Sequence, residues 1–192
     1  MVEHLAARQG APVDVLGHSY GAVCALGAAA RGAPVRRFVL YEPPGLETVP
    51  VEWLNRVRAV IARGELGRAM VSFLVEVIGL TREQVEVLRA GAAGHDDPLP
   101  LVARTLVREA DALAAVDLAA LAVAVAQPVL LLLGTTSPAW AAAVTQGLVD
   151  ALPNAEVALL PDQGHEAVDS APDLVAHQLR RFLVEPSCPG WL

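Results

Sequence analysis

The sequence predicts an α/β fold with a mostly parallel sheet of about four strands. Short apolar stretches typical of strands alternate with helical segments at both ends of the chain. The middle of the chain, residues 45 to about 126, shows only helical periodicity, which predicts a helical cap insert. At 192 residues the chain is long enough for one domain with a real core. We therefore expect a single domain over residues 1–192, with its core in 1–44 and 127–192.

The first part of the chain predicts helix, strand, helix and strand. A helix that runs to Gln9 is ended by Gly10, and residues 13–16 are an apolar stretch typical of a strand. The segment 17–21 then leads into an Ala-rich helix that runs to about residue 30. Residues 37–41 form the second predicted strand, which Glu42 and two prolines close.

The insert and the last part of the chain complete the pattern. Apolar residues at helical spacing predict helices around residues 53–61 and 70–77, and Thr81 to Gln84 has the spacing of a capping box. A loop over 91–100 and a helix over 101–115 follow. The remaining segments are a buried strand over 128–133, a helix to residue 152, a strand over 156–160 and a helix opened by residues 170–173. The helix to residue 152 is expected to have Ser137 as its N-cap and Pro138 in its first turn.

Composition excludes several classes of protein. The basic residues are all Arg and are scattered over a chain of net charge −7, so nucleic acid is not an expected partner. The two cysteines lie far apart without metal-ligand spacing, and we expect no disulfide, metal or organic cofactor. The most apolar stretch, 118–133, is interrupted by Gln127 and Pro128 and is too short to span a membrane. Residues 1–10 show no secretory signal, so a cytoplasmic location is expected.

The segment Gly17-His18-Ser19-Tyr20-Gly21 has the Gly-x-Ser-x-Gly pattern of a nucleophile elbow. An apolar strand precedes it and an unbroken helix follows, which is the context that the motif requires. We expect both glycines to allow close packing around a strained Ser19, and the backbone N–H of Tyr20 to serve as an oxyanion donor. His18 and Tyr20 are expected to shape the pocket. The alternative is that Ser19 is an ordinary helix N-cap.

His165 follows the last predicted strand, at the carboxyl edge of the sheet, and is the candidate general base. His4, His95 and His177 lie in polar surroundings typical of the surface. The acid that orients the imidazole is less well defined. Glu42 ends the second strand, where the next proline should hold it extended, and is the candidate acid. A solvent-facing or Arg-paired Glu42 is the alternative, and Asp162 and Glu166 stay open although both lie very near His165 in sequence.

The chain resembles the α/β-hydrolase family in four features: the elbow, the Gln163-Gly164-His165 loop, the order of serine before histidine and the insert after the second strand. The resemblance covers residues 5–184 and implies a serine acyl hydrolase that works through an acyl-enzyme. Many members carry Asp where this chain has Ser137, and some relatives take the acid from the position of Glu42.

The family's first strands, and the loop that gives its second oxyanion donor, would precede the elbow. The resemblance therefore implies a partial α/β-hydrolase fold, and a truncated gene product, a mis-called start and half of a split enzyme all stay open. The strand over 13–16 would then lie at an exposed sheet edge, where self-association or a companion chain is a possible outcome.

Our leading hypothesis is a serine hydrolase of esters or thioesters with Ser19 as nucleophile, His165 as base and Glu42 as acid. The apolar residues Trp53, Met70, Phe73 and Ile78 of the insert suggest a small or medium apolar acyl group. The competing hypothesis is a catalytically impaired, truncated remnant that binds a ligand or a partner chain.

Overall fold

The computed structural model describes residues 1–91 and 102–184 of the chain. Two compact units are distinguished: a sheet unit formed by Met1–Pro44 and Asp117–Leu192, and a helical unit formed by Gly45–Val116. The sequence put the end of the insert at about residue 126. In the structure helix α8 (Leu118–Val123) belongs to the sheet unit instead, where Ala122 and Val125 pack in its core.

The sheet unit contains four parallel strands in chain order: β1 (Val13–His18), β2 (Val35–Tyr41), β3 (Val129–Gly134) and β4 (Ala155–Leu160). This confirms the predicted α/β class with a parallel four-stranded sheet. In the register, His18 lies opposite Tyr41, and Tyr41 lies opposite Leu132. The strands therefore end close to one another, which gathers the residues that follow them at one edge of the sheet.

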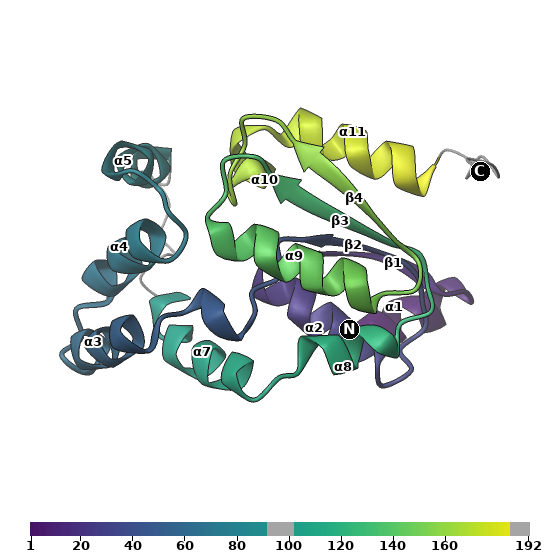
Figure 1. Ribbon diagram of the computed structural model, residues 1–192, viewed down its shortest axis with the longest axis horizontal. Helices are drawn as coiled ribbons and strands as arrows, with labels where there is room; N and C mark the ends of the chain where they lie inside the picture. The colour runs from purple at the N-terminus through teal and green to yellow at the C-terminus, as the bar shows by residue number, and fades with distance from the viewer. Residues whose placement is uncertain (92–101, 185–192) are drawn as a thin grey trace. The chain divides into compact units, whose positions relative to one another are not determined.

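Helices cover both faces of this sheet (Figure 1). Side chains alternate along each strand, so Phe38 and Leu40 pack on one face and Val39 and Tyr41 on the other. The helices of the sheet unit, besides α8, are α1 (Val2–Gln9), α2 (Tyr20–Ala29), α9 (Ala139–Ala151), α10 (Ala167–Ser170) and α11 (Pro172–Leu183). The first face packs against α2, α8 and α9, and the second against α10 and α11. Burial on both faces explains why the central strands are continuously apolar in sequence.

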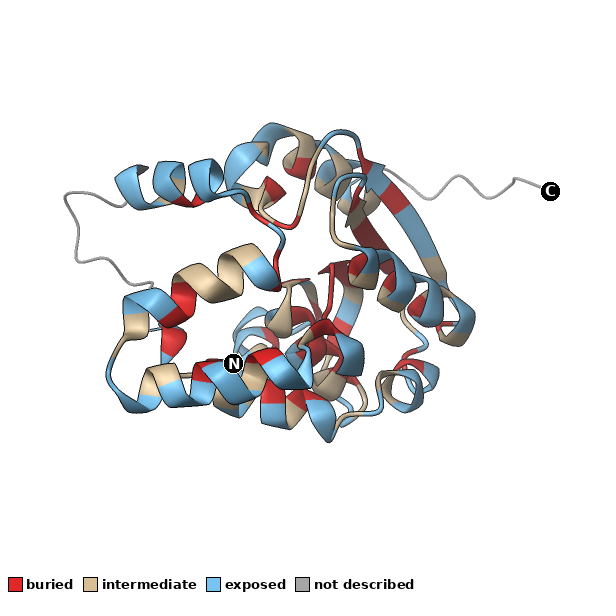
Figure 2. Cartoon of the chain, turned by 60° about the vertical axis from the view of Figure 1, so that its left-hand side comes forward, coloured by how far each residue is buried: buried red, intermediate tan, exposed pale blue. Residues whose placement is uncertain are grey.

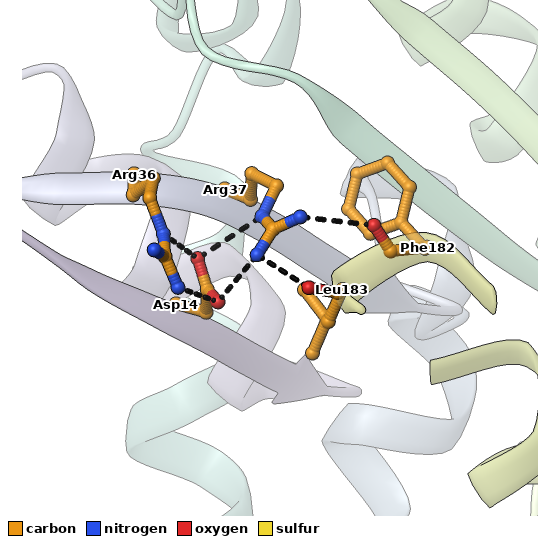
Figure 3. A network of polar contacts seen from close by, with 5 residues as sticks. All are labelled: Asp14, Arg36, Arg37, Phe182 and Leu183. Atoms are coloured by element: carbon orange, nitrogen blue, oxygen red, sulfur yellow. Dashed lines mark hydrogen bonds and ion pairs between the residues drawn. The ribbon is translucent and has the colours of Figure 1, made fainter. Parts of the chain in front are cut away.

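A polar network ties two strands to the end of α11 (Figure 3). Asp14 of β1 accepts hydrogen bonds from both Arg36 and Arg37 of β2. Arg37 also donates to the backbone carbonyls of Phe182 and Leu183, which the helix end leaves without intrahelical partners. The hydrogen bond from Arg36 is the largest cause that lowers the pKa of Asp14, to about 2. The ionised carboxylate thus holds β1 to β2, and Arg37 extends the network to α11.

The helical unit consists of a short 3₁₀ turn (Leu46–Thr48) and the helices α3 (Val51–Ala62), α4 (Leu66–Glu76), α5 (Arg82–Gly91) and α7 (Leu106–Ala114). The predicted capping box is confirmed, because the backbone N–H of Thr81 donates to Gln84 and that of Gln84 donates to Thr81. The predicted loop over 91–100 lies almost wholly outside the described residues. The helices carry both buried and exposed residues, as amphipathic helices do (Figure 2).

The apolar side chains of the insert that suggested an acyl pocket have a different role. Trp53 and Met70 are buried in the helical unit's own core, with Phe73 packed against them. The Trp53 and Phe73 rings lie 5.9 Å apart. These residues stabilise the unit, so the expectation that they mark an apolar acyl group is wrong for these three.

Candidate active site

Ser19 lies in the turn between β1 and α2, where the sequence places the elbow. Its φ of 53° and ψ of −129° are sparsely populated for a residue with a side chain. The Ser19 N–H donates to the Tyr41 carbonyl at 2.9 Å, which holds this turn against the end of β2. Tyr20 begins α2, so its amide lies at the helix N-terminus, where the dipole favours negative charge.

The two glycines of the elbow are not equivalent. A Cβ atom on Gly17 would come within 2.6 Å of the Ala22 Cα, so only glycine fits there. A Cβ atom on Gly21 would meet nothing within 4 Å among the described residues. The prediction of close packing is therefore confirmed for Gly17 and wrong for Gly21 within this part of the chain.

Glu42 is fully buried, and its carboxylate accepts three hydrogen bonds. One carboxylate oxygen accepts from the Gly134 N–H at 2.8 Å and from the Ser137 hydroxyl at 2.5 Å. The other accepts from His165 Nδ1 at 2.7 Å. Burying a carboxylate is costly unless its oxygens are hydrogen-bonded, and these three bonds satisfy both oxygens.

The backbone of Glu42 differs from the prediction. It was expected to be extended before Pro43, but its φ is 42°, in the left-handed region. This conformation is strained for a residue other than glycine, so the surrounding contacts must compensate for it. The three hydrogen bonds of the carboxylate, together with the bond of 3.3 Å from the Glu42 N–H to the Leu132 carbonyl, hold this turn in place.

Ser137 was predicted to cap the helix that follows it, and this is wrong. The residue at the N-cap position of α9 is Pro138, and no side chain caps that helix. The Ser137 hydroxyl donates to Glu42 instead. Ser137 is thus a hydrogen-bond donor to the buried carboxylate.

His165 follows β4 in a loop that folds back over the end of β3. The Thr136 N–H donates to the Gln163 carbonyl at 3.0 Å, and the Asp162 N–H donates to the Thr135 hydroxyl at 2.8 Å. A Cβ atom on Gly134 would lie 2.3 Å from the Gln163 carbonyl oxygen, so glycine is needed where the loop crosses the strand. This crossing brings His165, which is 5% exposed, to Glu42.

His18 and Tyr41 form hydrogen bonds with the backbone around His165 that the sequence did not predict. His18 was expected to shape the pocket, but its Nε2 lies 2.9 Å from the His165 carbonyl oxygen. Burial is the largest cause that lowers the pKa of His18, to about 4. The Tyr41 hydroxyl donates to the Gly164 carbonyl. The signal in the sequence was weak: His18 directly precedes Ser19, and Tyr41 ends a buried strand.

The partner of His165 Nδ1 is Glu42 rather than Asp162 or Glu166, the other two candidate acids. Asp162 is exposed, and Glu166 has a buried carboxylate oxygen without a hydrogen-bond partner in the described part of the chain. His4 and His177 are exposed, as expected, and His95 lies outside the described residues. Trp140 of α9 packs edge-on against His165, with ring centroids 5.5 Å apart.

Residues 1–91 and 102–184 contain neither a cluster of metal-ligand side chains nor a membrane-spanning helix. No group of three or more His, Cys, Asp or Glu side chains in these ranges could hold a metal ion. Their helices also lack the combination of length and apolar character needed to cross a bilayer.

The chain is similar to known proteins both in sequence and in structure. The sequence profile described as the Alpha/beta hydrolase family matches residues 1–178. A solved alpha/beta hydrolase from Sphaerobacter thermophilus is 30% identical, with a TM-score of 0.76, and the match covers 95% of this chain and 71% of that one. No curated protein matches the chain.

Two more distant structures share the fold. A highly thermostable carboxyl esterase from Bacillus coagulans is 19% identical, with a TM-score of 0.63, over 94% of this chain and 67% of that one. Est816, described as an N-acyl homoserine lactone degrading enzyme, is 20% identical, with a TM-score of 0.62, over 94% of this chain and 71% of that one.

Proposed function

The chain belongs to the alpha/beta hydrolase family, and on that premise we propose that it is a serine hydrolase that cleaves a carboxylic ester or thioester through an acyl-enzyme. Ser19 is the nucleophile, His165 the general base and Glu42 the acid. One observation carries the proposal: the buried hydrogen bond of 2.7 Å between Glu42 and His165, at the sheet edge where Ser19 follows the last residue of β1. A buried carboxylate that orients an imidazole is the arrangement that activates a serine.

Glu42 sets the tautomer of His165. The ionised carboxylate can only accept a hydrogen bond, so Nδ1 carries the proton and Nε2 keeps its lone pair. His165 Nε2 can then take the proton of the Ser19 hydroxyl as its oxygen attacks the acyl carbon. The imidazolium that forms is stabilised by the negative charge of Glu42.

The reaction proceeds in two halves. In the first, the bond from Ser19 Oγ to the acyl carbon forms, the carbon–oxygen or carbon–sulfur bond to the leaving group breaks, and His165 passes its proton to the leaving group. In the second, a water molecule gives a proton to His165 and attacks the acyl-enzyme. Ser19 Oγ then recovers that proton and the carboxylic acid leaves. The Tyr20 N–H stabilises the oxyanion in both halves.

The class of substrate is supported by the relatives. Two of the similar structures are those of a carboxyl esterase and of an enzyme that degrades N-acyl homoserine lactones. Both kinds of substrate contain an acyl carbon bonded to oxygen. We therefore infer a carboxylic ester or thioester as the substrate.

A fluorophosphonate probe tests the proposal. The wild-type chain should be labelled on Ser19 and should hydrolyse p-nitrophenyl butyrate, and Ser19→Ala should lose both. Ser72→Ala is the matched control, because Ser72 lies on α4 of the helical unit and should leave labelling intact. A folded wild-type chain that takes no label would contradict the proposal.

A binding module without turnover is the second candidate, favoured by one observation. In the described sheet β1 lies at an edge, and Leu16 on that strand is 47% exposed. Edge strands with exposed apolar residues tend to pair with other chains. Absence of labelling together with concentration-dependent dimers in analytical ultracentrifugation would favour this candidate.

A further inference from the structure

The backbone on both sides of His165 is held by two side chains from other strands. The hydroxyl of Tyr41, at the end of β2, donates to the Gly164 carbonyl and accepts from the Ala167 N–H at 3.2 Å. His18, at the end of β1, lies with Nε2 at 2.9 Å from the His165 carbonyl oxygen. Three backbone groups in four successive residues are thus fixed by side chains more than 120 positions away.

The two side chains support each other. The rings of His18 and Tyr41 are stacked, with centroids 4.8 Å apart and an angle of 22° between their planes. The His18 ring also lies 4.6 Å from the His165 ring. Tyr41 is fully buried, so it cannot move away from the loop without opening the core.

Chemistry fixes the roles of these groups in the hydrogen bonds. A carbonyl oxygen can only accept, so His18 must carry a proton on Nε2. Burial favours the neutral ring, since it lowers the pKa of His18 to about 4. Burial likewise raises the pKa of Tyr41, which therefore keeps its proton as a donor. Both side chains can hold the loop across the neutral pH range.

We propose that His18 and Tyr41 are positioning residues that clamp the backbone around His165 and so hold its imidazole against Glu42. Neither residue is expected to touch the substrate. The kinetic part of this inference depends on the proposed function, while the geometric part does not. The clamp also links the elbow to the base, because His18 directly precedes Ser19.

The kinetic test removes each hydrogen bond in turn. Tyr41→Phe and His18→Ala should lower kcat by ~10- to 100-fold with KM changed less than ~3-fold, because a base displaced by about 1 Å loses ~10²-fold in rate. His18→Gln should recover most of the loss, since its amide can donate from nearly the same place as Nε2. His177→Gln, on the exposed surface of α11, is the control and should match the wild type.

A second measurement does not need turnover. In a proton NMR spectrum in water, the His165 Nδ1–H should give a resolved resonance, because the ring is buried and bonded to Glu42. This resonance should be lost through exchange with water in His18→Ala and Tyr41→Phe, and kept in His18→Gln. A role confined to packing would lower the melting temperature of these variants and leave the resonance in place.

The outcomes are distinct. Folded His18→Ala and Tyr41→Phe proteins that both keep the resonance and the wild-type kcat would overturn the clamp. Should Tyr41→Phe fail to fold, the comparison of His18→Ala with His18→Gln decides alone. A wild-type chain without labelling or turnover would contradict the proposed function, and the resonance would still decide the clamp.

Discussion

Replacing Glu42 with Gln changes one atom of the buried carboxylate and should remove most of the activity. The oxygen that accepts from Gly134 and Ser137 can be kept as the amide oxygen of Gln. The amide NH₂ then faces His165 Nδ1 at the position where an acceptor stood at 2.7 Å. Two donors cannot bond to each other, so Nδ1 must become the acceptor and the imidazole proton must move to Nε2.

This tautomer cannot accept the proton of Ser19. The equivalent change of acid to amide in a serine protease triad lowers kcat by ~10⁴, which corresponds to about 5 kcal/mol of transition-state stabilisation. We expect a loss of ~10³- to 10⁴-fold here. Stability should change by only about 1 kcal/mol, because the bonds from Gly134 and Ser137 persist.

The assay is the hydrolysis of p-nitrophenyl butyrate near pH 7.5, with the rate of fluorophosphonate labelling as a second readout. Circular dichroism verifies the fold of each variant. Glu156→Gln, an exposed carboxylate on β4, is the control and should retain wild-type turnover. A folded Glu42→Gln protein with kcat within ~10-fold of the wild type would refute the assignment of Glu42 as the acid.

Two further predictions concern stability. Gly17→Ala should lower the free energy of unfolding in urea by about 1 to 3 kcal/mol, because its Cβ would lie 2.6 Å from a backbone atom of Ala22. Gly21→Ala, whose Cβ meets nothing within 4 Å in the described residues, should leave the free energy of unfolding unchanged, and equal losses in both variants would contradict this reasoning. Asp14→Asn should cost about 1 to 2 kcal/mol at pH 7, because the pKa of Asp14 is lowered from 3.8 to about 2 in the folded state. The ionised Asp14 carboxylate makes its full contribution to the free energy of unfolding above the unfolded pKa, and this contribution is lost as the pH falls through 2. The difference in the free energy of unfolding between Asp14→Asn and the wild type should therefore close between pH 5 and pH 2. A difference that stays constant with pH would be inconsistent with the ion pair.

Much of the fold could be predicted because its signals are local. Glycine and proline mark the ends of elements, and apolar periodicity distinguishes helices from strands. The Thr81 capping box was predicted from four residues and is formed by those residues alone. The close approach at Gly17 is also local, since it involves Ala22.

The errors occur where a local explanation competes with a distant partner. Ser137 before Pro138 has the pattern of a helix start, but its hydroxyl instead donates to a carboxylate 95 positions earlier. A proline after Glu42 favours extended backbone, but the left-handed turn is stabilised by bonds to residues 92 and 123 positions later. A local backbone preference is worth only about 1 kcal/mol, whereas a buried carboxylate without its hydrogen bonds would cost more. The hydrogen bonds of Glu42 therefore decide the local conformation.

The sequence alone determined the order of strands and helices, the position of the elbow at Ser19 and the candidates Glu42 and His165. Tertiary structure decided which side chains meet at the carboxyl edge of the sheet, including Ser137, His18 and Tyr41. The reason is physical. Hydrogen bonds between side chains gain strength when water is excluded, and water is excluded here only after parallel strands bring distant residues together. Partners of this kind leave no periodic pattern in the sequence.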